Sequence, residues 1–375
     1  MAFFQKQGRR RAEKEYWAYD ITTISSYSET LNQVKWGKNK ENDRLQQLNL
    51  ALIFGEESNL PFYYRKLPGN IPDVKTVKHL LSELQLLGYD KVKLVMDRGF
   101  YSQDNINGLF QNHLKFLIAV KISLKYVHGK LEESKDALHS WTNYNEKHEL
   151  YAVTHTILWD YEQKRPYKGD VIKEKRRCYL HLYFNSEKAA DDAKRMNYYL
   201  TRLKSELDSK QELPEHQKDY RKYFTVKDTP VRGRKVVPND AAIQEATKDY
   251  GYFALLSNEV KEPIVALDLY RNKDLVEKAF GNLKERLNFR RTLVSSESSL
   301  KGKLFVEFIA LIYLSYIKKQ MQDEGLFSQW TLQGLLDELD VIECLEAPGH
   351  SPTLGEITKK HLDIYAAMDI EPPSL

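Results

Sequence analysis

The hydrophobic and polar positions of the first third of the chain predict strands and helices in a regular order. Runs rich in aromatic and β-branched residues predict strands at 16–26, 48–55, 61–67, 91–97 and 115–121. Between the third and fourth strands, apolar residues at helical spacing predict a helix that ends at Gly88, because glycine readily adopts the left-handed C-cap conformation. Ser102 is well placed to cap a second, shorter helix.

This order predicts an α/β fold. A meander of three strands followed by strand–helix–strand crossovers gives a mixed sheet with flanking helices, which is the order of a ribonuclease H-like fold. In such a sheet the first and fourth strands are neighbours. Asp20 lies in the first predicted strand and Asp97 at the end of the fourth. The topology therefore predicts two carboxylates close together.

A large insertion separates the last strand of this pattern from a helix near residue 277. It contains strand-like pieces, a long charged helix and a polar stretch with three prolines. The strand-like segment 251–258 marks the return to the core. We divide the chain into a basic N-terminal arm at 1–15, a first core segment at 16–121, the insertion at 122–250, a second core segment at 251–321 and a C-terminal helical tail at 322–375.

The helix near residue 277 has two different faces. Its apolar face consists of Val276, Ala279, Phe280, Leu283 and Leu287. Lys273, Glu277 and Lys284 follow Tyr270 at offsets of three, seven and fourteen residues. At about 3.6 residues per turn these four share the neighbouring face. Taken alone, the pattern also fits an ordinary surface helix with a Lys273–Glu277 pair.

Three acidic residues together suggest a metal site. Carboxylates that lie close together repel one another unless cations offset their charge. Mg²⁺ and Mn²⁺ prefer such oxygen ligands. Two ions about 3.5–4 Å apart can activate an attacking oxygen and stabilise a leaving one at a phosphodiester. Each aspartate alone fits an ordinary strand-end residue, but Asp20, Asp97 and Glu277 in this order predict a site for two ions.

Charge is informative locally rather than globally. The net charge is only +4. Residues 164–177 and residues 218–235 each contain seven basic and two acidic residues. Such runs are typical of surfaces that bind phosphate, and also of ordinary solvated surfaces. The charge alone leaves both interpretations open.

The sequence predicts neither export nor a membrane span. Cys178 and Cys344 provide no disulfide framework, which suits a reducing compartment. The most apolar run, Leu304–Ile317, is too short to span a bilayer and contains Glu307, so we expect a buried helix there. We therefore expect a cytoplasmic protein.

These motifs resemble a known family. The residues Tyr270, Lys273, Glu277 and Lys284 resemble the Tyr-x2-Arg-x3-Glu-x6-Lys signature of DDE transposases from bacterial insertion sequences, the insertion sequence family four and its relatives. AYDITTISSYSE around Asp20 and VMDRGFYS around Asp97 are similar to the family's other two acidic motifs. The resemblance runs from about residue 16 to residue 321 and is weakest in the insertion.

The resemblance implies a DNA transposase that hydrolyses phosphodiesters and transfers strands at the ends of an insertion element. Mg²⁺ or Mn²⁺, as two ions, would be bound by Asp20, Asp97 and Glu277. The implied DNA-binding residues are Tyr270, Lys273, Lys284, Arg290 and Arg291. The implied partners are double-stranded DNA, both element ends and target, and a second copy of the chain in a homodimer assembled on that DNA.

The chain departs from the family pattern in two places. Lys273 replaces the signature arginine, which keeps the charge but loses bidentate phosphate geometry, so weaker anchoring is expected. Asp20 lies where relatives still have an N-terminal DNA-binding region, which predicts a chain that lacks this region. In the insertion, Trp141 or Trp159 fits an aromatic that stacks on a displaced base, and each fits a core tryptophan equally well.

Three other interpretations are open. A non-catalytic DNA-binding remnant of a truncated transposase would retain the fold without the reaction. A structure-specific ribonuclease H-like nuclease would use the same metals without strand transfer. A haloacid dehalogenase-like phosphatase would require a second aspartate where Thr22 stands, and it leaves Glu277 without a role.

Overall fold

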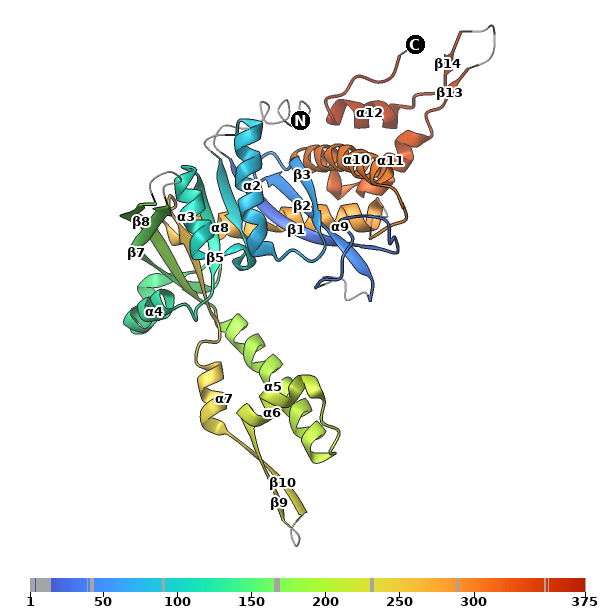
Figure 1. Ribbon diagram of the computed structural model, residues 1–375. Coiled ribbons are helices and arrows are strands. Elements are labelled where there is room, and N and C mark those ends of the chain that lie inside the picture. The colour runs from blue at the N-terminus through green and yellow to red at the C-terminus, as the bar shows by residue number, and fades with distance from the viewer. Residues whose placement is uncertain are drawn as a thin grey trace. The chain divides into compact units, whose positions relative to one another are not determined.

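The computed structural model describes residues 4, 15–38, 40, 44–89, 92–164, 169–229, 233–287, 290–346, 349 and 351–374. The chain divides into two compact units, one formed by Met1–Val95 with Arg271–Leu375 and the other by Met96–Tyr270 (Figure 1). Strands and flanking helices alternate along the chain. The predicted α/β class with a mixed sheet is therefore confirmed.

The first unit contains the predicted meander. β1 (Tyr16–Ser26), β2 (Gln46–Gly55) and β3 (Pro61–Pro68) are successive antiparallel neighbours. β4 (Lys93–Met96) lies on the other side of β1, so the order is β3-β2-β1-β4. The first and fourth strands are therefore adjacent, as predicted. The two-residue strand β12 (Arg291–Thr292) pairs with the end of β1 in parallel, which makes the sheet mixed.

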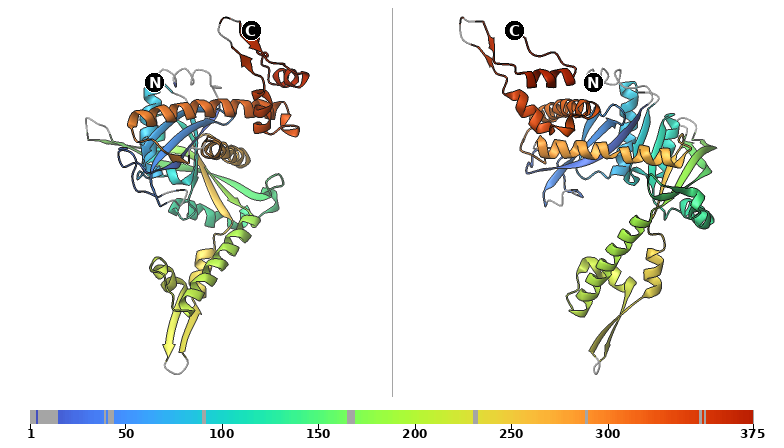
Figure 2. Two further views of the ribbon diagram at one scale, coloured as in Figure 1. Left: turned by 90° about the vertical axis from the view of Figure 1, so that its right-hand side faces the viewer. Right: turned by 180° about the vertical axis from the view of Figure 1, so that it is seen from behind.

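Helices cover both faces of these strands (Figures 1 and 2). α2 (Asp73–Leu87) ends at Gly88, whose φ of 73° is the left-handed conformation predicted from the sequence. The opposite face is covered by α9 (Asp274–Gly281), the π-helical turn η4 (Asn282–Arg286) and α10 (Glu297–Asp323). The C-terminal part adds η5 (Leu326–Ser328), α11 (Leu332–Asp340), the short pair β13 (Cys344–Leu345) and β14 (Thr353–Leu354), and α12 (Lys359–Ala367).

The alternation of side chains along β1 separates these two layers. Trp17 points to the α2 side, where it stacks on Phe62. Ala18 and Ile24 point to the other side and belong to the two apolar clusters formed with α9, η4 and α10. Because successive side chains of a strand point to opposite faces, Asp20 lies on the same face as Ala18 and Ile24. The carboxylate is thus on the side of the helix that carries Glu277.

The expectation of a buried helix at Leu304–Ile317 is correct for one face of the helix only. Within α10, Leu304, Phe308 and Leu311 are buried. Val306 and Tyr313 on its other side are each 66% exposed. The helix lies on the surface of the unit, so only one of its faces can pack against β2 and β3, although apolar residues occur around its whole circumference.

The second unit contains the rest of the predicted core and the insertion. η1 (Arg98–Phe100) and α3 (Gln103–Gln111), which Ser102 caps as predicted, precede β5 (Lys115–Val120) and α4 (Lys125–Leu138). Next come η2 (Trp141–Asn143), β6 (Tyr144–Asn145), β7 (Leu150–Lys164) and β8 (Val171–Phe184). β11 (Tyr252–Ser257) lies between β5 and β8 and is antiparallel to both. The strands of the insertion therefore extend the sheet that contains β5.

A small helical arm, residues 186–247, lies between β8 and β11 in the chain. It consists of α5 (Ser186–Asp208), η3 (Pro214–His216), α6 (Gln217–Tyr223), β9 (Phe224–Thr229), β10 (Gly233–Pro238) and α7 (Asp240–Thr247). Leu203, Leu207, Tyr220, Tyr223, Phe224 and Val236 form its apolar core. The arm thus has a hydrophobic cluster of its own.

The predicted domain limits differ from these two units. The unit boundary at Val95 and Met96 falls inside the expected first core segment, and the boundary at Tyr270 and Arg271 falls inside α8 (Pro263–Asn272). The expected basic arm at 1–15 lies outside the described residues except for Phe4 and Glu15. In the described part of the chain, no helix combines the length and apolar character needed to cross a bilayer.

His181 in β8 should make the stability of the protein depend on pH. The ring is fully buried, its Nε2 donates to the Val260 carbonyl at 3.2 Å, and its Nδ1 lies 2.7 Å from the Thr154 hydroxyl. Burial lowers its pKa to about 4 from an ordinary value of 6.5. The unfolded chain therefore binds the proton first as the pH falls below 6.5, and stability is lost progressively down to pH 4.

At pH 5 this loss should amount to about 2 kcal/mol relative to pH 7. Urea unfolding of the native chain and of His181→Gln at both pH values measures it. We expect the native chain to lose more stability than His181→Gln between pH 7 and pH 5. An equal loss in both proteins would show that His181 is not the group responsible.

Candidate active site

Asp20 lies in the middle of β1, opposite Leu52 of β2, and is half-buried. Its Oδ1 accepts the backbone N–H of Ile21 at 2.8 Å. Burial raises the pKa of this carboxyl, because ionisation is costly away from water. The positive charges of Lys40 and Lys273 lower it, and the negative charge of Glu277 raises it further.

Glu277 and Lys273 form an ion pair at the start of α9. Lys273 stands at the single residue that separates α8 from α9, and its side chain is only 5% exposed. Its Nζ donates to Glu277 Oε1 at 2.9 Å, while the glutamate side chain is 59% exposed. The buried ammonium thus offsets the charge of a carboxylate that faces solvent.

The first unit therefore brings together two of the three predicted carboxylates. Asp20 and Glu277 are close enough to repel each other electrostatically, and Lys273 acts favourably on both. Lys40, from the segment between β1 and β2, is the strongest favourable charge acting on Asp20. Lys40 was not predicted as a site residue, because no motif or periodicity in a single sequence marks a lysine in such a segment.

Asp97 follows β4 directly and lies in the second unit. Its Oδ1 caps η1 by accepting the Arg98 N–H at 2.7 Å. The same oxygen accepts the hydroxyl of Tyr270 at 2.8 Å. Tyr270 is on α8 and belongs to the same unit. The tyrosine, which the resemblance implies to be a DNA contact, thus orients the second predicted carboxylate in this structure.

The continuous helix predicted around Glu277 is wrong. α8 ends at Asn272, α9 begins at Asp274, and η4 follows as a π-helical turn closed by the bond from the Leu287 N–H to the Asn282 carbonyl at 3.1 Å. A π-turn is wider than an α-turn, since its bonds span five residues. The count of 3.6 residues per turn that aligned Lys284 with Glu277 therefore does not hold beyond Gly281.

Arg290 and Arg291 follow η4 and return the chain to β1. The carbonyl of Arg290 accepts the Ser25 N–H at 3.1 Å, and Arg291 pairs with Ser25 in the parallel β1–β12 bridge. The Arg290 side chain contacts Glu285 at 3.0 Å, and the Arg291 side chain donates to the Tyr27 hydroxyl at 3.1 Å. Both arginines lie on the surface at the end of the strand that carries Asp20.

A different cluster with metal-ligand chemistry occurs in the second unit. His128 and Glu132 of α4 and Asp249 offer ligand atoms within 4.8 Å of one another. The i, i+4 spacing of His128 and Glu132 is the signal in the sequence that points to this cluster. Lys135 places its ammonium 2.6 Å from Glu132 and 3.4 Å from Asp249. This cation already satisfies the acidic groups, so the cluster is an ion-pair network.

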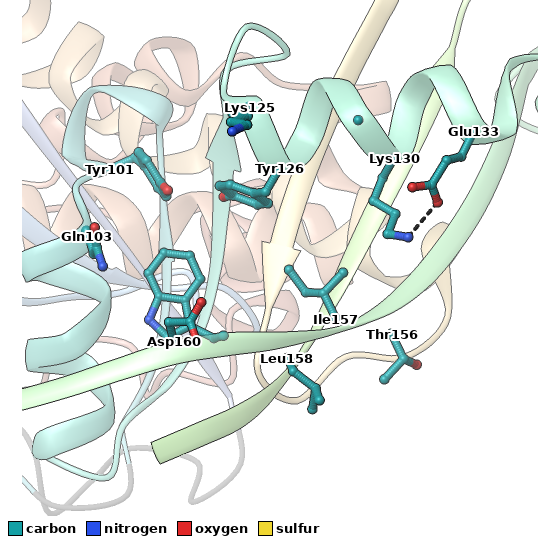
Figure 3. Close-up of a pocket in the computed structure, with 12 residues that line it drawn as sticks. Tyr101, Gln103, Lys125, Tyr126, Lys130, Glu133, Thr156, Ile157, Leu158 and Asp160 are labelled. Carbon is teal, nitrogen blue, oxygen red and sulfur yellow. Dashed lines mark hydrogen bonds and ion pairs between the residues drawn. The ribbon is translucent and has the colours of Figure 1, made fainter. Parts of the chain in front are cut away.

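The second unit also contains a groove of about 750 Å³ between α4, β7 and the segment after Asp97 (Figure 3). Tyr101 and Tyr126 lie on one side of it, and Lys130 and Glu133 form an ion pair at 2.5 Å (Figure 3). The groove is lined by Trp159 but by none of the predicted carboxylates.

The two tryptophans proposed as base-stacking residues differ in their exposure to solvent. Trp159 is only 7% exposed, and its indole N–H donates to Asn107 at 2.9 Å. Trp141, in η2, is 84% exposed. Trp159 is thus a packed residue, whereas the Trp141 ring is accessible.

The acidic groups suit a hard divalent cation. Asp20 has one carboxylate oxygen committed to the Ile21 N–H, and Glu277 has a single ion-pair partner within the described residues. Glu277 raises the pKa of Asp20, and neighbouring carboxylates are the oxygen ligands that Mg²⁺ and Mn²⁺ prefer. Asp20 and Glu277 can therefore hold such an ion, and Asp97 offers a further carboxylate that Tyr270 orients.

Comparisons with known proteins identify the family of this chain. The family described as "Transposase DDE domain" matches residues 13–313, which include Asp20, Asp97 and Glu277. No curated protein sequence matches the chain. Among solved structures, the cryo-EM structure of a piggyBac transposase synaptic complex with hairpin DNA has a TM-score of 0.43 and 10% identity, over 99% of this chain and 61% of that chain. The chain thus spans about three fifths of the length of that transposase.

The family match covers most of the chain and all three acidic motifs, and it is independent of the weak similarity to the solved structure. The protein belongs to the family of the transposase DDE domain.

Proposed function

We propose that the protein is the catalytic part of a DNA transposase that cleaves phosphodiesters and transfers strands at the ends of an insertion element. The observation that carries this proposal is the pairing of Asp20 with Glu277 on one face of the first unit. One is a half-buried strand residue with a raised pKa, and the other lies on the covering helix. A fold rarely retains repelling carboxylates of this kind without a cation or a function.

The metal ligands in this proposal are Asp20, Asp97 and Glu277. Bound Mg²⁺ or Mn²⁺, as two ions, would supply Lewis acidity at the phosphodiester and activate the attacking oxygen. Lys273 holds Glu277 and compensates its charge when no metal is bound. Tyr270 acts as a positioning residue, because its hydroxyl fixes the orientation of the Asp97 carboxylate.

The proposal also covers the core fold, the substrate, the assembly and the residues that contact DNA. We infer a ribonuclease H-like core, supported by the order β3-β2-β1-β4 and by the family match. Double-stranded DNA at element ends and target is the proposed substrate, and a homodimer on that DNA is the proposed assembly. The proposed DNA contacts are Lys273, Lys284, Arg290 and Arg291, whereas Tyr270, which the resemblance also implies, is assigned to Asp97 instead. The exposed arginines at the end of β1 fit this role better than Lys273, which is buried and paired.

A non-catalytic DNA-binding remnant is the second candidate. The Lys273–Glu277 ion pair favours it, because this pair satisfies the glutamate without any metal. The two candidates differ in one property, namely metal-dependent strand cleavage by the purified chain.

Replacing a proposed ligand should abolish cleavage. We expect Glu277→Gln and Asp97→Asn each to lower the rate of Mg²⁺-dependent cleavage by more than about 100-fold, because losing even an outer-shell partner of a metal ligand typically costs 10–100-fold. Nicking of a labelled duplex measures the rate. Asp274→Asn is the matched control, since Asp274 is an exposed acid on the same helix, and it should cleave normally. Cleavage at the native rate by Glu277→Gln would refute the assignment.

Tyr270→Phe separates the positioning role from a DNA-binding role. Without the hydroxyl, Asp97 loses a 2.8 Å hydrogen bond. We expect the Mg²⁺ concentration for half-maximal cleavage to rise by about 10-fold or more while duplex affinity measured without metal stays the same. The reverse pattern, weaker DNA binding with an unchanged metal requirement, would assign Tyr270 to DNA instead.

Asp20→Asn should stabilise the metal-free protein at neutral pH. The folded-state pKa of Asp20 is raised above its ordinary value of 3.8, so stability is lost as the pH rises through that folded pKa. An asparagine avoids the cost of ionisation. Urea unfolding in the presence of a chelator should show the variant to be more stable than the native chain at pH 7 and equally stable near pH 3. A variant less stable at pH 7 would contradict this account of Asp20.

A further inference from the structure

The end of the helical arm is a two-stranded ribbon formed by β9 and β10 (Figure 1). In its register Lys227 lies directly opposite Lys235. Both side chains are exposed. Directly opposite residues of an antiparallel pair have Cβ atoms about 4.5–5.5 Å apart, and like charges at such positions are destabilising.

The two lysines lie on the outer face of the ribbon. Val226 and Val236, a directly opposed pair one position away, pack into the arm core instead. Arg234 is on their side of the ribbon and forms an ion pair with Glu212 at 2.6 Å. Because side chains alternate along a strand, Lys227 and Lys235 point away from that core.

Asp228, next to Lys227 in the chain, lies opposite Arg234 on the other face of the ribbon. Glu206 binds Arg202 and His216, and Asp219 accepts the hydroxyl of Tyr199 at 2.6 Å. Among the described residues, neither Lys227 nor Lys235 has an ion-pair partner. The outer face of the ribbon is therefore left with two opposed and uncompensated positive charges.

In the other basic run of the insertion, residues 164–177, two lysines lie opposite acidic residues. In the β7–β8 hairpin, Lys173 lies opposite Glu162 and Lys175 lies opposite Asp160. Both pairs form ion pairs, the first at 3.1 Å. The two runs contain equal numbers of basic and acidic residues in the sequence, but Lys173 and Lys175 face acidic residues whereas Lys227 and Lys235 face each other.

We propose that the ribbon binds the phosphate backbone of duplex DNA through Lys227 and Lys235. The inference rests on the proposed function, in that DNA is the partner, and adds a binding surface in the arm to it. A two-stranded ribbon is narrow enough to enter the major groove, and lysines contact phosphates without reading sequence. Exposed basic residues on α6, namely Lys218, Arg221 and Lys222, precede the ribbon in the chain.

Salt dependence of duplex binding by the full-length chain tests the proposal. The probe is a fluorescent duplex of random sequence, and a chelator in the buffer prevents cleavage. Each phosphate contact adds about 0.9 to the slope of log affinity against log salt concentration. We expect Lys227→Gln/Lys235→Gln to bind more weakly and with a slope shallower by about 1.8. Lys227→Arg/Lys235→Arg, which retains both charges, should keep the native slope.

The β7–β8 hairpin provides the matched control. Lys173→Gln/Lys175→Gln removes the same charge from lysines that are already paired, and the slope should not change. The exposed position of Lys227 and Lys235 lets the ribbon variant fold, and loss of their repulsion should leave its melting temperature equal or higher. An unchanged slope in the ribbon variant, or an equal change in the control, would overturn the proposal.

The result can be separated from the test of cleavage. A chain that cleaves DNA and whose ribbon variant keeps the native slope would retain the proposed function and lose the ribbon. A chain that does not cleave, but whose ribbon variant shows the shallower slope, would retain the ribbon and lose the proposed function. Displacement of the duplex by polyglutamate at equal charge concentration would indicate an acidic protein as partner and overturn the assignment to DNA.

Discussion

An ionisable carboxylate on the covered face of β1 is the constraint on which the arrangement of the first unit depends. Asp20 shares that face with Ala18 and Ile24, which pack against the covering helices. Its burial raises its pKa, and Glu277 on the covering helix raises it further. A purely structural protein would place an apolar side chain there.

Two lysines make this arrangement tolerable. The charge of Lys40, in the segment between β1 and β2, favours the ionised form of Asp20, and Lys273 is buried at the break between α8 and α9. Breaking the helix at Lys273 places an ammonium beside both carboxylates. The charged pair Lys273–Glu277, the helix break and the π-turn that follows occur within a few residues of one another. Such irregularities are common where a fold accommodates a functional site.

Much of the fold was predictable because it depends on local patterns. The strands around Asp20 and Asp97 follow from aromatic and β-branched runs. α2 ends at Gly88 because glycine readily adopts the left-handed C-cap conformation. The helix around Glu277 was predictable only in part. Its apolar residues keep α-helical spacing, but neither the break at Lys273 nor the π-turn at η4 leaves a signal in the sequence. Between them, Val276, Ala279 and Phe280 pack against β1 and β2.

Pairing between distant segments was not predictable. The position of β11 between β5 and β8 joins the insertion to the sheet, and only the register of these strands reveals it. Register also distinguishes the two basic runs, which are equivalent by composition. Lys173 and Lys175 face acidic residues across β7 and β8, whereas Lys227 faces Lys235 across β9 and β10. Tyr270 is a similar case, because its bond to Asp97 links residues far apart in the chain.

The central claim is that Asp20, Asp97 and Glu277 bind divalent metal ions. Mn²⁺ titration of the full-length chain in the presence of duplex DNA, followed by electron paramagnetic resonance, tests it most directly. The account predicts saturable binding of about two ions per chain, and loss of that binding in Asp20→Asn. Absence of saturable binding in the native chain, or equal binding by Asp20→Asn, would contradict it.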